Sequence, residues 1–340
     1  MTTNFTSYSI LVQSDTLIML IYNINVGFLM GVISMFGLLS NIINICVFVQ
    51  QGFRDKFNIS LFALAVSDIG TLLSSLIYIL CSKPLLGSAS LPVDLFEVQN
   101  WIGGFPRGTF SRITNCVTTY ITFERCICVV FPIKVKGLIT ARVTVVTLVF
   151  IYLVMASTII PPYLGLVVTW RFDSFSNRTI LSMPFETNDG YAYIIAIANV
   201  HSFIQLVTYA LIIACTIVLA EELRKQSKWR LKAAQTNDIS SKVARKKVNK
   251  TIRMIASMAV IYIVCYSTSV FQLVFCAVVP DYPWTMYAMY WIVFSFAILM
   301  ESVNSSVGIF LYYTMSAKFR ITFIRTFLAC SQSMKSAISN

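Results

Sequence analysis

Seven long stretches of mostly apolar residues divide this chain, and they set the strongest limit on how it can fold. A helix of about 20 mostly apolar residues crosses the roughly 30 Å hydrocarbon core of a membrane. None of the stretches alternates apolar and polar residues as the strands of a membrane barrel do. They therefore predict an all-α membrane protein with a bundle of seven transmembrane helices. The stretches are about 16–53, 57–82, 105–131, 143–169, 190–220, 254–280 and 282–317.

The composition agrees with a membrane protein. Of the 340 residues, 57% are hydrophobic and 12% are charged, whereas soluble domains are about 45–50% apolar and about 25% charged. These values exclude a disordered protein, a small disulfide-rich secreted module and a nucleic-acid-binding domain. The expected surroundings are the lipid bilayer, and no nucleic-acid partner is expected.

The positions of Lys and Arg predict the orientation of the bundle. With the N-terminus outside the cell, 21 of the 26 basic residues fall on the cytoplasmic side, where basic residues are normally enriched. Met1 to Asp15 has no basic residue ahead of an apolar core, so no signal peptide is expected. The chain is thus predicted to lie in the plasma membrane with its N-terminus extracellular. The five remaining basic residues are Lys83, Arg107, Arg112, Arg171 and Arg178.

Three parts follow from this topology. Residues 1–24 form an extracellular segment, and residues 25–317 form the seven-span domain. Within that domain the third cytoplasmic loop covers about 221–253 and has eleven basic and three acidic residues, a net charge of +8. The charge suits docking of a cytoplasmic partner protein, although orientation and attraction to anionic lipid explain it equally well. Residues 318–340 form an amphipathic helix and a cytoplasmic tail.

The amphipathic helix is predicted from its phenylalanines. Phe319, Phe323 and Phe327 recur every four residues and share one helical face, which suits a helix lying on the inner leaflet. Cys330 follows this helix directly. It is either a palmitoylation site or an ordinary cytosolic thiol.

Six charged residues lie within the predicted spans, where each costs about 3 kcal/mol on insertion scales. Such residues are functional or belong to a structural pair. They are Asp68, Arg107, Arg112, Glu124, Arg125 and Glu301.

Several short motifs occur in a characteristic order along these spans. They are Ser40-Asn41, Leu64-Ala65-Val66-Ser67-Asp68, Glu124-Arg125-Cys126, Pro132, Tyr209, Cys265-Tyr266-Ser267-Thr268, the run from Asn304 to Tyr312, and Lys318-Phe319-Arg320. In the order and spacing of these motifs the chain resembles the rhodopsin-like (class A) G-protein-coupled receptors. Within that family, Thr119 to Cys126 and the segment 131–136 are most similar to divergent mollusc receptors assigned to chemosensation.

The resemblance implies a receptor that binds an extracellular ligand in the outer half of the bundle and activates a heterotrimeric G protein at the inner face. Arrestin is a further implied partner, and no cofactor is expected. For Arg125 the alternative is an ordinary arginine of the cytoplasmic side. The residues implied in coupling and switching are Glu124, Arg125, Pro132, Tyr209, Tyr266 and Tyr312.

The resemblance also implies a polar core in the middle of the bundle. Asp68, Thr114, Asn304 and Ser305 match positions that help the family to hold a sodium ion. The alternative is a protonated Asp68 that is hydrogen-bonded to Asn41 and Asn304, since burial favours the neutral form of a carboxyl group.

Arg107, Glu301 and Tyr266 are the candidates for ligand binding. Arg107 lies 18 residues before Arg125, about five helical turns, and so faces the same side of the bundle. A guanidinium favours a carboxylate or another anionic group on the ligand. Alternatively, Arg107 forms an internal ion pair with Glu301, or reaches the outer headgroups. The helical angle of Arg112 places it away from Arg107, toward the fourth and fifth spans.

The chain also departs from the family. The usual prolines of the fifth, sixth and seventh spans are absent, so weaker kinks, or kinks made by Ser, Thr and Gly, are expected. The usual outer disulfide also has no cysteines to form it, because none lies in 83–113 or 162–190.

Other functions were weighed. A neuropeptide receptor is the main alternative to a chemosensory receptor for a small ligand, and a channel or transporter is a weaker one. An enzyme is not expected, because the chain has one histidine and no metal-ligand or nucleophile motif. A light receptor would need a lysine where Ser302 stands. The usable glycosylation sequons begin at Asn4 and Asn177.

Overall fold

The structure is a computed structural model, and it describes residues 16–82, 91–131, 139–173, 177–183, 188–232, 239–279 and 287–328. Its elements, in chain order, are η1 (Asn23–Leu29), α2 (Met30–Gln51), α3 (Lys56–Leu80), α5 (Leu95–Val98), η2 (Gln99–Gly104), α6 (Phe105–Val130), α8 (Ala141–Ser157), α9 (Ile160–Leu164), β1 (Thr169–Asp173), β2 (Arg178–Ser182), α10 (Asn188–Lys232), α11 (Ile239–Val278), α13 (Tyr287–Ser306), α14 (Gly308–Met315), α15 (Ala317–Phe323) and η4 (Ile324–Leu328).

Within the described residues, six helical stretches are long and apolar enough to cross a membrane. The first is continuous and begins at Thr16, so it starts within the segment 1–24 that was predicted to precede the spans. These six match six of the seven predicted spans by length and composition. They are Thr16–Gln51, Lys56–Leu80, Ala141–Leu164, Ile195–Glu222, Ile252–Val278 and Met289–Met315.

The remaining predicted span, 105–131, corresponds to α6, which has 26 residues, four of them charged. At about 1.5 Å per residue it is long enough to cross a bilayer. α6 packs against α3, α8, α10 and α11, and its Arg107 and Glu124 are buried. Charged residues of membrane helices face the protein interior because lipid cannot solvate them. The central place of α6 therefore accounts for its polarity, and its crossing of the membrane remains a prediction.

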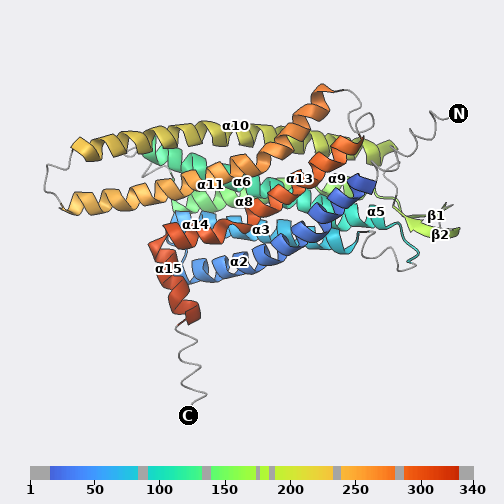
Figure 1. Ribbon diagram of the computed structural model, residues 1–340, viewed down its shortest axis with the longest axis horizontal. Coiled ribbons are helices and arrows are strands. Elements are labelled where there is room, and N and C mark those ends of the chain that lie inside the picture. Colours follow the sequence, from blue (N-terminus) through green and yellow to red (C-terminus); the bar gives the residue numbers. More distant parts are fainter. Residues whose placement is uncertain are drawn as a thin grey trace, which may run out of the picture.

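Figure 1 shows the long helices lying side by side, with the strands at one end of the bundle and α15 at the other. We call these the hairpin end and the α15 end. α10 and α11 extend beyond the other helices at the α15 end (Figure 1). The segment 221–253, predicted as a loop, is thus helical up to Lys232 and again from Ile239. Its many Glu, Lys, Arg and Ala residues favour helix, which continues past the end of the apolar run.

The all-α prediction omitted a small sheet. β1 and β2 pair antiparallel, with Thr169 opposite Ser182 and Asp173 opposite Arg178. Thr, Trp, Phe and Ile are frequent in these two segments, and such residues favour strands. The hairpin is too short for the span-scale periodicity of the sequence to reveal it.

The hairpin is attached to the rest of the protein by hydrogen bonds. Ser182 Oγ and the backbone nitrogen of Met183 both donate to the buried carboxylate of Glu97. The backbone nitrogen of Asp94 donates to the carbonyl of Leu181 at 2.9 Å, and Trp101 Nε1 donates to the carbonyl of Met183 at 3.1 Å. These bonds fix β2 to α5 and η2. The eight cysteines within the described residues are all unpaired, so no disulfide among them supports this region.

The seventh predicted span, 282–317, is divided into two helices. α13 ends at Ser306 and α14 begins at Gly308, with Val307 between them. A Ser and a Gly thus flank the break where the family carries a proline, as the departures in the sequence suggested.

α15 follows α14 after a change of direction at Ser316, whose Oγ accepts from the backbone nitrogen of Phe319 at 3.2 Å. Phe319 is buried, whereas Ile321 and Ile324 are exposed. Figure 1 shows α15 turned away from the long axis of the bundle. A helix with exposed apolar residues at this place suits the predicted position on a membrane surface, which remains a prediction.

Candidate functional site

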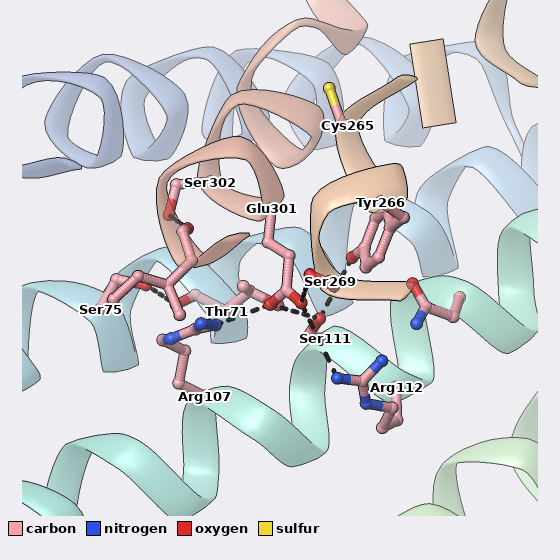
Figure 2. Close-up of polar contacts among 12 residues, drawn as sticks. Thr71, Ser75, Arg107, Ser111, Arg112, Cys265, Tyr266, Ser269, Glu301 and Ser302 are labelled. Carbon is pink, nitrogen blue, oxygen red and sulfur yellow. Dashed lines mark hydrogen bonds and ion pairs between the residues drawn. The ribbon is translucent and has the colours of Figure 1, made fainter. Parts of the chain in front are cut away.

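Three charged residues from two helices meet in the half of the bundle nearer the hairpin end, where α6 begins. Arg107 Nη1 lies 2.7 Å from Glu301 Oε2, and Arg112 Nη2 lies 3.7 Å from Glu301 Oε1. Figure 2 shows both guanidinium groups directed at the same carboxylate. We call these three residues the charged cluster.

Hydroxyl groups complete the surroundings of Glu301. Ser111 Oγ donates to Oε2 at 3.1 Å, and Ser269 Oγ donates to Oε1 at 2.9 Å. Tyr266 lies behind Ser111, with 3.1 Å between the two hydroxyl oxygens (Figure 2). Because the Ser111 hydrogen is directed at Glu301, Tyr266 is the donor in this contact. Both carboxylate oxygens are thus occupied by partners from the chain itself.

The arrangement follows from helical spacing. Arg107 and Ser111 are four residues apart on α6 and so lie on one face. Sequence reasoning selected Arg107, Glu301 and Tyr266 as ligand-binding candidates, and the structure places all three within this group of contacts. Their binding of a ligand stays a prediction. Sequence reasoning missed Ser111 and Ser269, because serines are common in these spans, and only the four-residue interval from Arg107 marks Ser111.

Arg112 differs from the expectation drawn from its helical angle. It lies about 140° around α6 from Arg107, at about 100° per residue, yet both side chains reach Glu301. An arginine stem is long and flexible, and α6 has other helices on several sides, so the head of Arg112 turns back into the bundle. His201, on the fifth predicted span, has its Nε2 2.8 Å from Thr158 Oγ1.

The Asn115 side chain holds the other side of Arg112. With its amide oxygen toward Arg112 Nη1, the two atoms are 3.0 Å apart, and the amide nitrogen then lies 2.9 Å from the Tyr266 hydroxyl. This orientation satisfies both contacts. It also links Arg112 to Glu301 through Tyr266 and Ser111.

A cavity of about 370 Å³ adjoins the charged cluster. Small-molecule pockets in proteins are usually about 300–1,000 Å³ and mostly apolar, with a few polar groups that orient the ligand. This cavity has that character, since the three charged side chains share it with aromatic and aliphatic ones. Its other lining residues include Phe105, Gln272, Leu273, Tyr290, Phe294 and Ile298.

The predicted polar core lies deeper in the bundle, around Asp68. Thr114 Oγ1 lies 3.1 Å from Asp68 Oδ1 and 2.9 Å from Ser67 Oγ. Asn41 Nδ2 donates to the carbonyl of Ser305 at 2.7 Å, which ties the first span to the seventh.

Asp68 and Asn304 both line a small cavity of about 30 Å³. This is room for an ion or a water molecule, which needs about 10–15 Å³. One carboxylate with neighbouring hydroxyl and amide groups is a donor set that fits a sodium ion. Among the described residues no group of three or more His, Cys, Asp and Glu side chains forms a metal site.

A second set of charges lies at the α15 end of α6. Lys56 Nζ is 2.9 Å from Oε1 of the buried Glu124, whereas Arg125 Nη2 is 3.9 Å from the same oxygen. The guanidinium of Arg125 lies 4.4 Å from the centre of the Phe57 ring, close enough for a cation–π contact. The pairing of Glu124 with Arg125 is thus shared with Lys56, which sequence reasoning placed in a loop.

The two inner tyrosines have other contacts. Tyr209 donates its hydroxyl to the carbonyl of Ile263 at 3.1 Å and so joins α10 to α11. Tyr312 is buried, with its ring centre 5.4 Å from that of Phe48 and 5.6 Å from that of Phe319. Their implied roles in coupling and switching stay a prediction. Pro132 lies outside the described residues.

Of the three predicted modification sites, the structure describes Asn177. Asn177 is exposed in the connection between β1 and β2, with a φ of 50°, a left-handed conformation that Asn tolerates better than most residues. It is therefore accessible at the hairpin end. Asn4 and Cys330 lie outside the described residues.

A family model described as "Serpentine type 7TM GPCR chemoreceptor Srw" matches residues 25–330. The chain belongs to this family. The match covers the charged cluster, the cavity, the polar core and the charges at the α15 end. A comparison with curated protein sequences found no match.

Among solved structures, the crystal structure of squid rhodopsin is similar to this chain at a TM-score of 0.61, with 15% sequence identity. The similarity covers 92% of this chain and 87% of squid rhodopsin. At this identity it establishes a shared fold. Ser302, which stands where visual pigments carry their lysine, is buried and donates to the carbonyl of Ile298 at 3.0 Å.

Proposed function

We propose that this chemoreceptor-family chain binds an extracellular ligand in the cavity beside the charged cluster and activates a heterotrimeric G protein at the α15 end. It lies in the plasma membrane with the hairpin end outside the cell, and α6 crosses the membrane together with the six more apolar helices. We also propose that the chain is a rhodopsin-like receptor of the mollusc subgroup and that it recruits arrestin.

The cavity beside the charged cluster carries this proposal. Each intramembrane charge costs about 3 kcal/mol on insertion scales, and three of them converge here. A purely structural ion pair needs good packing around it, whereas these side chains adjoin a cavity of about 370 Å³. A ligand site explains both the charges and the space.

The α15 end supports the second half of the proposal. α10 and α11 project beyond the bundle there (Figure 1), and the segment 221–253 has a net charge of +8. Arg125 lies at the same end of α6, and it is the residue that the resemblance assigns to the activation switch. These features suit a docking surface for a partner protein on the cytoplasmic side.

The test is nucleotide exchange on purified heterotrimeric G proteins by the full chain in nanodiscs. Pools of amines, amino acids, organic acids and neuropeptides are added in turn. We expect at least one small-molecule pool to accelerate exchange, and Arg125→Ala to lose most of that acceleration. Arg142→Ala is the matched control, because Arg142 is an exposed arginine near the start of α8, and we expect it to behave as the unmodified chain does.

Two outcomes would overturn parts of this proposal. A response to the neuropeptide pool alone would replace the small-molecule receptor with a peptide receptor. The same lipids can also be used to reconstitute the chain into liposomes. Ion flux across these liposomes, without any acceleration of nucleotide exchange, would indicate a channel or transporter.

A further inference from the structure

The charged cluster contains one positive charge more than it contains negative charges. Glu301 is the carboxylate partner of both Arg107 and Arg112 among the described residues. All three side chains are largely buried, with exposed fractions of 8% for Arg107, 14% for Arg112 and 5% for Glu301. A buried charge without a counterion is costly, so the surplus calls for an anion.

The hydrogen bonds show that the carboxylate of the cluster is fully occupied, whereas one nitrogen of Arg112 is not. Both oxygens of Glu301 already accept from hydroxyl groups and lie beside guanidinium groups. In contrast, the two guanidinium groups share this one carboxylate, and Nε of Arg112 has no hydrogen-bond acceptor within the described part of the chain. An ammonium group on a ligand would meet an occupied carboxylate, whereas a carboxylate would meet guanidinium groups that have more positive charge than Glu301 neutralises.

The cavity defines the remainder of the ligand. Arg107, Arg112 and Glu301 contribute to its lining, and so do Tyr290, Phe294 and Leu273. Aromatic and aliphatic side chains favour an apolar body by about 25 cal/mol per Å² of apolar surface buried. At about 370 Å³ the cavity suits a molecule much smaller than a peptide.

We propose that the ligand is a small organic acid with one carboxylate, which pairs with the guanidinium of Arg112, and an apolar body, which lies against Tyr290 and Phe294. This proposal rests on the proposed function, because it names the ligand class of the same cavity. The carboxylate would neutralise the surplus charge. Because a guanidinium binds a carboxylate through two parallel hydrogen bonds, Arg112 would also fix the orientation of the ligand.

The test measures the thermal stability of the purified full chain in nanodiscs, without a G protein. The probes share short-alkyl, longer-alkyl and phenylalkyl skeletons, and each skeleton is supplied as the carboxylate, the amide and the amine. A ligand that binds the folded state raises the melting temperature. We expect at least one carboxylate to raise it at millimolar concentration, while the amide and amine of the same skeleton do not.

Variants change the charge of the cluster in both directions. Arg112→Gln removes the surplus charge, and we expect it to weaken carboxylate binding about tenfold or more, the loss that accompanies a hydrogen bond to a charged group. Glu301→Gln adds to the surplus, and we expect it to strengthen binding. Arg171→Gln is the matched control, because Arg171 is an exposed arginine at the hairpin end that pairs with Asp94 and lies outside the cavity lining.

Stabilisation by amines, or by none of the carboxylates, would overturn the ligand class. If Arg112→Gln does not fold, Glu301→Gln decides: unchanged or weaker carboxylate binding in that variant would overturn the role of the surplus charge. Because stability is measured without a G protein, failure here leaves the nucleotide-exchange result standing. Failure of the exchange test with successful carboxylate binding would leave the ligand class standing and remove the signalling role.

Discussion

Lys56 gives the clearest case of a single residue whose role depends on the folded structure. It starts α3 and reaches the buried Glu124 on α6 at 2.9 Å, closer than Arg125 does at 3.9 Å. One carboxylate thus serves two cations. Because Lys56 competes for Glu124, the restraint that Glu124 places on Arg125 is weaker than in an isolated pair.

We expect Lys56→Met to lower basal G-protein activation. Without the lysine, Glu124 interacts with Arg125 alone and holds it more firmly in the resting position. A change of roughly 1 kcal/mol in this restraint corresponds to about a fivefold change in population. The measurement is basal nucleotide exchange per receptor at the cell surface, with Glu124→Gln expected to raise it.

Lys56→Arg is the control for this prediction, since it keeps the positive charge and should leave basal exchange close to its original level. A rise in basal exchange in Lys56→Met would show that Lys56 itself restrains the resting state. That result would contradict the competition described above.

The charged cluster shows what the sequence can predict about single residues. Intramembrane charges are rare and expensive, so Arg107 and Glu301 stand out, and helical spacing alone indicates that both face inward. Arg112 was misplaced, because a helical angle gives the direction of Cβ and not the reach of a long flexible stem. The contact between Lys56 and Glu124 joins residues 68 positions apart, and no local pattern predicts it.

At the scale of elements, a buried carboxylate is one of the groups that hold the hairpin at its end of the bundle, together with backbone hydrogen bonds and Trp101. Glu97 accepts from Ser182 Oγ at 2.9 Å and from the backbone nitrogen of Met183. Arg171 and Asp94 add an ion pair at 3.0 Å, but Arg171 is half exposed. Exposed pairs contribute about 0–1 kcal/mol, whereas a hydrogen bond to a charged group contributes about 1.5–3 kcal/mol.

We expect Glu97→Ala to loosen β2. The substitution leaves buried donors of β2 without an acceptor, so the backbone amides of 178–183 should exchange with deuterium about tenfold faster or more, in line with the loss of a charge-assisted hydrogen bond. Arg171→Ala, which removes only the exposed ion pair, should change this exchange little. Equal effects of the two variants, or no effect of Glu97→Ala, would show that other contacts hold the hairpin.

The helices were largely predictable and the hairpin was not. Long apolar runs give a strong signal because each span must bury its backbone polar groups in a helix. The break at Val307 agrees with the expectation that Ser, Thr and Gly make the kinks in spans without the usual proline, since Ser306 and Gly308 flank it. β1 and β2 have five residues each, which is too short for a clear pattern in the sequence. β2 is also held by contacts with residues 92–101, which are distant in the sequence, so no local pattern predicts it. The segment 221–253 was predicted as a loop because it is charged, but many of its charged residues have a high helix propensity, and most of the segment is helical.

At the scale of the whole molecule, α6 connects the two sites. Arg107 and Arg125 are 18 residues apart on this one helix, which is about 27 Å at 1.5 Å per residue. Between them, Thr114 contacts Asp68 in the polar core. Coupling between distant sites needs an element that both sites bias between two arrangements, and α6 contacts both charged groups.

The central claim is that a molecule entering the cavity from outside the cell changes G-protein activation at the opposite end. Cys276 allows a direct test, because it lines the cavity and its side chain is exposed. A membrane-impermeant, negatively charged thiol reagent is added to intact cells that carry a G-protein activation sensor. The anionic group of the reagent then lies beside the surplus positive charge of the cluster.

The account predicts that the reagent changes the sensor signal in cells with the unmodified chain, and that Cys276→Ser abolishes the change. Arg125→Ala should also abolish it, although Cys276 is still labelled in that variant. A change that appears only after the cells are permeabilised, or one that persists in Cys276→Ser, would contradict the claim.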